Sequence, residues 1–363
     1  MKSFHTILLV LGAALFIYLL QSVGVSELWS QLAVLGWGLV PLILGEGLAE
    51  MVHTIGWRYC LSGPLRSLAW STLFRIRMSG YAINYLTPTA ALGGEVTKGV
   101  LLSAYHPGPD AATGVLIGKL CFALAHLIFV TLGALLVLWR LPTPESLWVT
   151  MLVCGGVVGS GMLAFFLLQK YGKLGALVRC LAARMPANRP LSTFSRNLTA
   201  VDAALMRFYH ERPLSLTLAV AWHLAGYSVG IVQTFLFFHL IGYHASLSVA
   251  AGTWFLGMWF DLLTFAVPLN LGTLEGTRVV ALQALCYSAL TGMTYGFALR
   301  LAQIFWACFG LLNYALLSSG AVAMLAPRQR TFSGACVPDS MPQDEKTCRG
   351  RRSAILFPIQ HPK

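Results

Sequence analysis

Charged side chains are scarce in this sequence. Asp, Glu, Lys and Arg make up 10% of its 363 residues, whereas a soluble domain carries about 25%. Hydrophobic residues make up 57%, and the mean hydropathy is +0.70. This composition excludes an ordinary soluble protein. It predicts an all-α, polytopic membrane protein, because helices satisfy their own backbone hydrogen bonds inside a bilayer.

Paired cysteines and familiar catalytic motifs are also missing. The eight cysteines are scattered and form no Cys-x-x-Cys pair, which argues against a disulfide framework and a zinc site. No Walker loop, dinucleotide fingerprint, nucleophile elbow or zincin motif is found,. We therefore expect no metal, no cofactor and no enzymatic activity. Without a nucleotide site, any transport would be passive or coupled to an ion.

Acidic residues are few compared with basic ones, 13 against 25, so the net charge is +12. Most of the cations lie in four segments, at Lys2, between Arg58 and Arg77, within 170–212, and after Ala326. Positive charge concentrated between apolar runs marks cytoplasmic segments of membrane proteins. We therefore predict no nucleic-acid partner. We expect a bacterial inner-membrane protein with both termini in the cytoplasm.

The apolar runs predict about six full membrane spans and two re-entrant or broken segments. We expect full spans at 4–23, 37–61, 114–139, 147–168, 214–241 and 295–325, a basic amphipathic stretch at 66–78, and broken segments at 79–104 and 247–290. The membrane domain would cover 1–325, with a first repeat at 1–168 and a second at 214–325. A basic cytoplasmic connection would join them at 169–213. The polar tail, 326–363, is expected to be disordered.

A duplicated motif lies within the two broken segments. The first copy is Pro88-Thr-Ala-Ala-Leu-Gly-Gly94-Glu95-Val-Thr-Lys98, and the second is Pro268-Leu-Asn-Leu-Gly272-Thr-Leu-Glu275-Gly-Thr-Arg278. Proline, glutamate, threonine and cation recur at an offset of 180 residues. Proline and glycine break helices. The duplication predicts a site built from two equivalent broken helices.

The distribution of basic residues gives the two copies opposite orientations. If the basic connections are cytoplasmic, the segment 79–104 enters and leaves from the cytoplasmic side, and 247–290 enters and leaves from the outer side,. The repeats are then inverted, and their breaks meet near the middle of the membrane. The alternative is that each broken segment forms two full spans.

The charged residues of the motif suggest ion pairs. Glu95 and Lys98, and likewise Glu275 and Arg278, are three residues apart, on one face of a helix,. Exposed N–H groups at the start of each half-helix can bind an anion. The two pairs could therefore line a central cavity for a polar lipid headgroup. They could instead be buried ion pairs that lock the two loops. With the helix breakers, the expected headgroup site comprises Asn84, Pro88, Gly94, Glu95, Lys98, Pro268, Gly272, Glu275 and Arg278.

A second polar group lies on the span 37–61. Glu46, Glu50 and His53 follow helical spacing and form one stripe,. The stripe could be a proton relay, a cavity wall, or a surface packed against neighbouring helices. A di-iron site would need a second Glu-x-x-His pair, which the sequence lacks,.

Other polar residues have structural interpretations. Asn84 and Asp261 could hydrogen-bond the broken backbone, and Asp261 could also meet Arg278 or Arg300. Lys119 and Arg300 would extend to a membrane interface. The tryptophans at predicted helix ends would form an interfacial aromatic belt, Trp37, Trp57, Trp139 and Trp148,.

The two motifs resemble a known family. The stretch from Arg77 through Asn84 to Pro88, followed by Gly94-Glu95 and Lys98, is similar to the signature of the lysylphosphatidylglycerol synthase transmembrane, or flippase-like, family. Its second signature matches Pro268, Leu271-Gly272 and Glu275. The resemblance covers most of residues 1–325. It implies a helical membrane domain with inverted re-entrant segments, lipid translocation between leaflets, and members that accompany polyprenyl-lipid, glycolipid or hopanoid pathways.

Two departures from the family pattern limit what is carried over. Lys98 stands where the family often has arginine, and lysine lacks the bidentate fork that binds phosphate,. The 38-residue tail is too short for the aminoacyl-transferase domain of bifunctional members, so synthase activity is not expected. The leading hypothesis is a flippase for an anionic or glycosylated lipid. The alternatives are a lipid-modifying enzyme that uses Glu46, Glu50 and His53, and a scaffold that docks lipid-biosynthesis enzymes on 169–213 and the tail. The sequence does not specify an oligomeric state.

Overall fold

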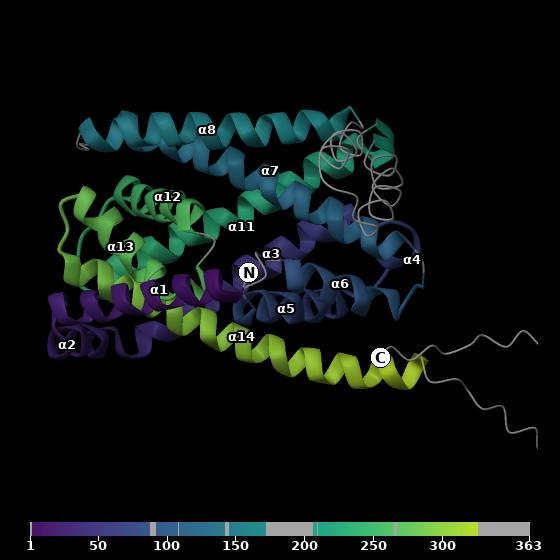
Figure 1. The fold of residues 1–363 in the computed structure, drawn as a ribbon, viewed down its shortest axis with the longest axis horizontal. Helices are drawn as coiled ribbons and strands as arrows, with labels where there is room; N and C mark the ends of the chain where they lie inside the picture. The colour runs from purple at the N-terminus through teal and green to yellow at the C-terminus, as the bar shows by residue number, and fades with distance from the viewer. Residues whose placement is uncertain are drawn as a thin grey trace, which may run out of the picture. The chain divides into compact units, whose positions relative to one another are not determined.

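A computed structural model of the chain describes residues 2–87, 92–107, 109–141, 145–171, 206–208, 210–264 and 267–325. Within these residues the regular structure is entirely helical (Figure 1). Met1–Leu325 forms one compact unit. Five of its described helical stretches are long and apolar enough to cross a membrane, Val25–Cys60, Asp110–Arg140, Pro213–Leu240, Leu247–Thr264 and Ala289–Ser319. The predicted polytopic, all-helical class is confirmed.

The helices fall into two sets with the same order. An N-terminal pair, α1 (Lys2–Val23) and α2 (Val25–Leu35), comes first, and η1 (Gly36–Gly38) follows it. The first set is α3 (Leu39–Cys60), the short α4 (Gly63–Arg66), α5 (Trp70–Leu86), α6 (Leu92–Ser103) and α7 (Pro109–Arg140), followed by α8 (Glu145–Lys170). The second set is α11 (Pro213–Leu240), α12 (Leu247–Thr264), the 3₁₀ turn η2 (Pro268–Asn270), α13 (Thr273–Ala284) and α14 (Ala289–Leu325).

The two sets meet along α3 and α11, which pack against each other over much of their length. The side chain of Gln233 donates a hydrogen bond to the Leu42 carbonyl (2.6 Å). Nearer the C-terminal end of α3, His53 contacts His223 of α11. Residue numbers rise on α3 as they fall on α11, so the two helices are antiparallel. Each set also packs its long final helix on the other set, α7 on α11 and α12, and α14 on α3 and α5.

The two broken helices enter from opposite ends of this unit. In Figure 1 the α5–α6 hairpin lies in the right half, beside α4, and the α12–α13 hairpin lies in the left half, beside the start of α14. Each hairpin packs its two short helices together. Each also places its interruption, after Leu86 or after Thr264, at its inner end. This is the arrangement that inverted repeats require.

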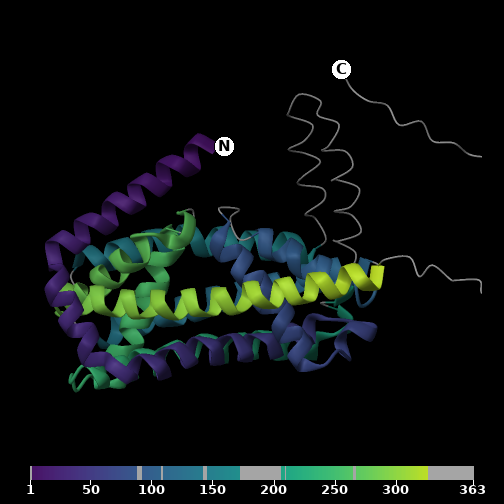
Figure 2. The same ribbon diagram turned by 90° about the horizontal axis from the view of Figure 1, so that it is seen from below.

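The second interruption has an unusual backbone. Leu269 and Asn270 have positive φ angles of 59° and 47°, and Gly272 follows with φ 71° at the N-cap of α13. Only glycine adopts this region without steric cost. A Cβ at Gly272 would also overlap the Gly12 carbonyl oxygen of α1. Helix α1, which otherwise diverges from the other helices (Figure 2), therefore touches the break.

Several local expectations were wrong. The residues left between the expected spans 4–23 and 37–61 form a further helix, α2, with Leu28 and Leu35 buried. The amphipathic stretch 66–78 is no separate element, because α4 ends at Arg66 and α5 begins at Trp70 and continues to Leu86. Trp57 is no belt residue, since it is 1% exposed, whereas Trp37 is 90% exposed. Most of the connection 169–213 and all of the tail 326–363 lie outside the described residues.

Candidate functional site

The first half-helix begins with a close contact between backbones. Helix α6 crosses α5 where two glycines meet, and a Cβ on Gly94 would overlap the Gly80 carbonyl oxygen. The Gly94 N–H donates a hydrogen bond to the Asn84 side-chain oxygen (2.6 Å). The expected role of Asn84 as a partner of broken backbone is thereby confirmed. Pro88 lies outside the described residues.

The carboxylate of the first motif is held by two lysines. The Lys98 ammonium lies 2.5 Å from one Glu95 oxygen, and the Lys119 ammonium lies 3.6 Å from the other. The predicted Glu95–Lys98 pair therefore exists, one turn apart on α6. Lys119 comes from α7. The sequence assigned it to a membrane interface, whereas the structure places its ammonium beside Glu95. The Lys119 side chain is 38% exposed, against 9% for Lys98.

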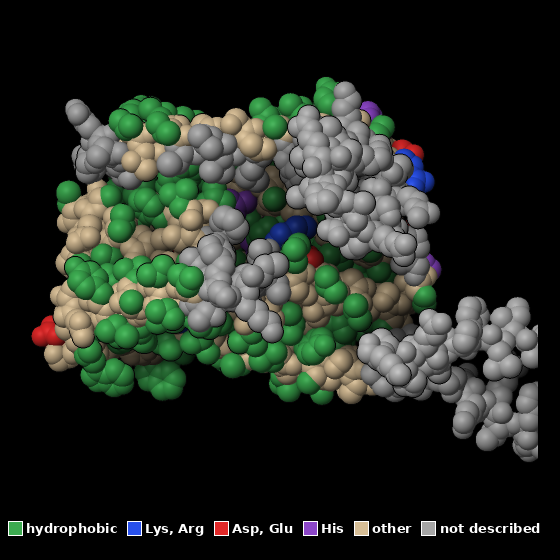
Figure 3. Space-filling view, in the orientation of Figure 1, with side chains coloured by type: hydrophobic (Ala, Val, Ile, Leu, Met, Phe, Trp, Pro, Cys, Tyr) green, Lys and Arg blue, Asp and Glu red, His purple; other side chains and the backbone are tan. Residues whose placement is uncertain are grey.

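These residues border a cavity of about 200 Å³ that lies within the first set of helices. Figure 3 shows Lys and Arg atoms in a hollow near the centre of the viewed face, with acidic and histidine atoms beside them. Three cations and two carboxylates line the cavity, so its formal charge is positive. The lining residues are Glu50, Trp57, Arg77, Tyr81, Asn84, Glu95, Lys98, Gly118, Lys119 and Phe122.

The remaining wall of the cavity combines an ion pair with two aromatic rings. Arg77 donates to the Glu50 carboxylate at 2.6 Å. The Lys98 ammonium lies 5.4 Å from the Trp57 ring centre, while Arg77 and Lys119 lie 5.5 and 5.7 Å from that of Phe122. Cations over aromatic faces are stabilised electrostatically. The two rings therefore help to stabilise three cations in a cavity that contains only two carboxylates among its lining residues.

The second motif is arranged differently. Glu275 is fully buried and pairs with Arg300 of α14, not with Arg278 as the spacing predicts. The Arg300 guanidinium donates to a Glu275 oxygen at 2.9 Å, and to the carbonyls of Leu269 (3.2 Å) and Asn270 (2.8 Å). Arg300 also contacts the Tyr85 hydroxyl of α5 at 3.4 Å. One arginine thus ties the second break to α14 and to the first hairpin.

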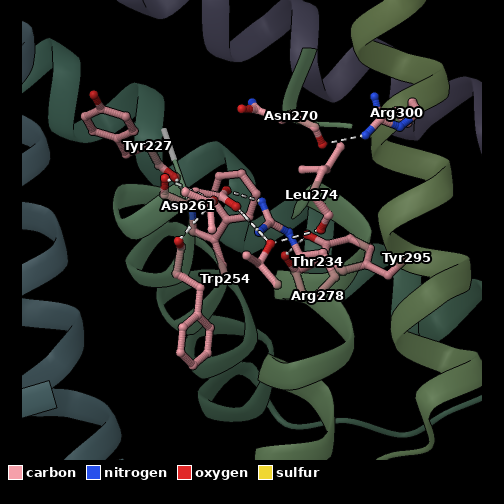
Figure 4. Close-up of polar contacts among 12 residues, drawn as sticks. Tyr227, Thr234, Trp254, Asp261, Asn270, Leu274, Arg278, Tyr295 and Arg300 are labelled. Atoms are coloured by element: carbon pink, nitrogen blue, oxygen red, sulfur yellow. Dashed lines mark hydrogen bonds and ion pairs between the residues drawn. The ribbon is translucent and has the colours of Figure 1, made fainter. Parts of the chain in front are cut away.

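Arg278 has its own partner on α12. Its guanidinium makes a bidentate pair with Asp261, at 2.7 and 3.0 Å, and the Thr277 hydroxyl donates to the same carboxylate at 2.9 Å (Figure 4). The expectation that Asp261 could meet Arg278 is confirmed. Arg278 is 2% exposed, and none of the second-motif residues lines the cavity. Two ion pairs therefore connect the second half-helix, α13, to its neighbours α12 and α14.

The polar stripe of α3 is divided among different surroundings. Glu50 lines the cavity through its pair with Arg77. Glu46 interacts with the Tyr81 hydroxyl and lies within electrostatic reach of Arg278. His53 packs against His223, with 3.0 Å between their Nδ1 atoms, and does not line the cavity. Only Glu50 of this stripe is a cavity wall.

Sequence reasoning missed the roles of Arg77, Lys119 and Arg300. Arg77 was assigned to a basic connection and the other two to interfaces, yet Arg77 and Arg300 are buried and all three hold glutamates. A signal was present in the numbering. Lys119 follows Glu95 by 24 residues and Arg300 follows Glu275 by 25, so the long helices after the motifs carry matching cations.

The arrangement has the chemistry of an anion site within a set of mainly apolar helices. No group of three or more His, Cys, Asp or Glu side chains suited to a metal ion occurs among the described residues. The fold and the cavity thus define a polytopic helical membrane protein with a cation-rich cavity among its helices. The model of the family described as "Lysylphosphatidylglycerol synthase TM region" matches residues 6–311, and the chain belongs to that family. Comparison with curated proteins and with solved structures gives no match.

Proposed function

We propose that this protein moves an anionic phospholipid between the two leaflets of the membrane. The cavity of the first motif would bind the lipid phosphate, with Lys98 and Lys119 as the cationic contacts and Asn84 beside them. The observation that carries the proposal is the positive cavity among apolar helices. Charged groups inside a membrane are costly, and they usually mark the path of a substrate or ion.

The position of Glu95 supports exchange with a phosphate. In this structure the Glu95 carboxylate pairs with both Lys98 and Lys119. An incoming phosphate offers the same cations further oxygen acceptors, and hydrogen bonds between charged groups are stronger than neutral ones. Lys119 is the more exposed of the two cations and would meet the headgroup first. Glu95 then serves as the internal counter-ion that occupies the site between cycles.

The inverted helices supply a route for alternation. In this structure the first motif borders a cavity, whereas Glu275 and Arg278 of the second are engaged by Arg300 and Asp261. Inverted repeats commonly exchange such conformations as access alternates. We expect the second-motif pairs to open when the first-motif cavity closes. The headgroup would then reach the residues of the second motif, Gly272, Glu275 and Arg278, from the other leaflet.

The alternative functions have less support. A lipid-modifying enzyme based on Glu46, Glu50 and His53 would need these groups around one substrate, yet only Glu50 lines the cavity. The docking surfaces of a scaffold, 169–213 and the tail, fall largely outside the described residues. Lipid-biosynthesis enzymes remain candidate partners, since they would supply or consume the translocated lipid.

A comparison of two charge removals on α7 tests the proposal. Purified protein is placed in vesicles, and movement of fluorescently labelled phosphatidylglycerol is followed by chemical quenching of the outer leaflet. Lys119→Gln is expected to slow movement about tenfold, because one charge-assisted contact to phosphate is lost. The matched variant Arg140→Gln removes a cation from the exposed end of the same helix, where Arg140 stacks on Trp139. Its rate should equal that of the native protein.

Two outcomes would count against the proposal. The proposal would be wrong if phosphatidylglycerol moved no faster in vesicles that contain the native protein than in vesicles without it. Equal rates for Lys119→Gln and Arg140→Gln would show that the cavity is not the path. Monodisperse elution and unchanged thermal unfolding of both variants control for folding.

A further inference from the structure

A second, mainly apolar groove lies next to the cationic cavity. Its volume is about 260 Å³, and it is lined by α7, α8 and α12. Its wall on α7 includes Val130, Ala134 and Leu138, and α8 contributes Gly155, Gly156 and Gly159. The three glycines present backbone where side chains would otherwise fill the space. The groove can thus accommodate a long, narrow apolar molecule against the α8 backbone.

The groove continues the cavity along one face of α7. Phe122 lines the cationic cavity and His126 lines the groove. Residues four apart lie on the same helix face, about 6 Å apart along the axis. Tyr227 packs against both rings, with centroids 5.2 Å from each. The polar site and the apolar groove are therefore as close as the two ends of one amphiphile require.

Two polar groups on the groove wall lack protein partners. The His126 Nε2 atom and the Trp259 indole N–H are buried, and neither forms a hydrogen bond with any residue that the structure describes. Trp259 is 4% exposed and lines the groove. A buried indole N–H usually has an acceptor. Ester oxygens, which lie between the phosphate and the hydrocarbon chains of a phospholipid, would provide one here.

We propose that this groove holds one hydrocarbon chain of the same phospholipid whose phosphate occupies the cationic cavity. The proposal rests on the proposed function and adds the position of the chain. Apolar groups gain little free energy on leaving lipid for a protein surface. The groove therefore acts by shape: the phosphate reaches Lys119 only if the chain beside it has somewhere to lie. The groove would therefore favour phospholipids with one long hydrocarbon chain that fits between α7 and α8.

Filling the groove tests this directly. A Cβ added at Gly159 meets no atom within 4 Å, and the same is true at Gly161, which does not line the groove. Gly159→Leu should therefore fold normally and occupy the groove, while Gly161→Leu is its matched control on the same helix. We expect Gly159→Leu to slow the movement of labelled palmitoyl-chain phosphatidylglycerol about tenfold, and Gly161→Leu to leave it unchanged. Thermal unfolding of both variants in detergent verifies that they fold.

A short-chain lipid separates the groove from the headgroup site. Dihexanoyl phosphatidylglycerol carries the same headgroup on chains too short to need the groove. Its affinity in detergent, measured by calorimetry, should be unchanged in Gly159→Leu and reduced about tenfold in Lys119→Gln. If Gly159→Leu moves the long-chain lipid as fast as Gly161→Leu while Lys119→Gln is impaired, the groove proposal is wrong and the headgroup site stands. If Lys119→Gln binds the short-chain lipid normally, the headgroup site itself is wrong.

Discussion

Replacing Arg300 with alanine is expected to lower the free energy of unfolding by about 3–5 kcal/mol. The substitution leaves Glu275, which is fully buried, without its ion-pair partner, and an uncompensated buried charge costs that much. It also removes the donors to the carbonyls of Leu269 and Asn270. Both residues hold positive φ angles, a conformation that costs about 1–2 kcal/mol for a residue with a side chain. Denaturation in mixed micelles, followed by tryptophan fluorescence, measures the loss.

A double-variant cycle separates the ion pair from nonspecific damage. Removing both charges together, as Glu275→Leu with Arg300→Met, leaves no unpaired charge. Apolar replacement of a complete buried pair is often tolerated. The double variant should therefore recover at least half of the stability lost in Arg300→Ala. Two results would contradict the view that this ion pair stabilises the second break. One is that the stability losses of Glu275→Leu alone and Arg300→Met alone simply add in the double variant. The other is an Arg300→Ala protein as stable as the native one.

Reversing the charge of Lys119 is expected to weaken binding of anionic lipid about 100-fold. Lys119→Glu changes the formal balance in the cavity from three cations and two carboxylates to two cations and three carboxylates. Unit charges 4 Å apart interact by about 4 kcal/mol near a protein surface, and solvent at the partly exposed position reduces this. A net loss of about 3 kcal/mol corresponds to about 100-fold in affinity. Calorimetric titration with dihexanoyl phosphatidylglycerol gives the value.

The design of this titration includes charge and position controls. The neutral variant Lys119→Gln should bind dihexanoyl phosphatidylglycerol about tenfold more weakly than the native protein. Arg140→Glu, the same charge reversal at the exposed end of α7, should bind it with native affinity,. Dihexanoyl phosphatidylcholine, which has no net charge, should distinguish the variants less than phosphatidylglycerol does. Equal affinities of Lys119→Glu and Arg140→Glu for phosphatidylglycerol would place the lipid outside the cavity.

The sequence could predict the helices and the interruptions because their causes are local. Apolar length sets the spans, and the pattern of Pro88, Gly94, Pro268 and Gly272 marks the breaks. The charge distribution then suggested opposed hairpins, and α5–α6 and α12–α13 do lie at opposite ends. Helix α2 was missed because its run of 11 residues is too short to register as a span,.

The ion pairs could be predicted only in part, because tertiary partners compete with neighbours on one helix. Glu95 and Lys98 pair at the expected spacing, but Arg278 turns to Asp261 on α12. The residue 180 positions before Asp261 is Tyr81. The first repeat therefore offers Lys98 no carboxylate on α5, and Lys98 remains with Glu95. This difference in carboxylates is one of those that distinguish the repeats, and no local rule reveals which long-range partner prevails.

Photo-cross-linking from the headgroup tests the central claim, lipid binding in the cationic cavity, most directly. Phosphatidylglycerol with a diazirine on its headgroup is irradiated with the protein in vesicles, and labelled peptides are sequenced by mass spectrometry. We predict labels on the cavity residues Trp57, Tyr81 and Phe122, strongly reduced in Lys119→Glu. Labels confined to outward-facing positions such as Trp37, which is 90% exposed, and unchanged by Lys119→Glu would contradict the account.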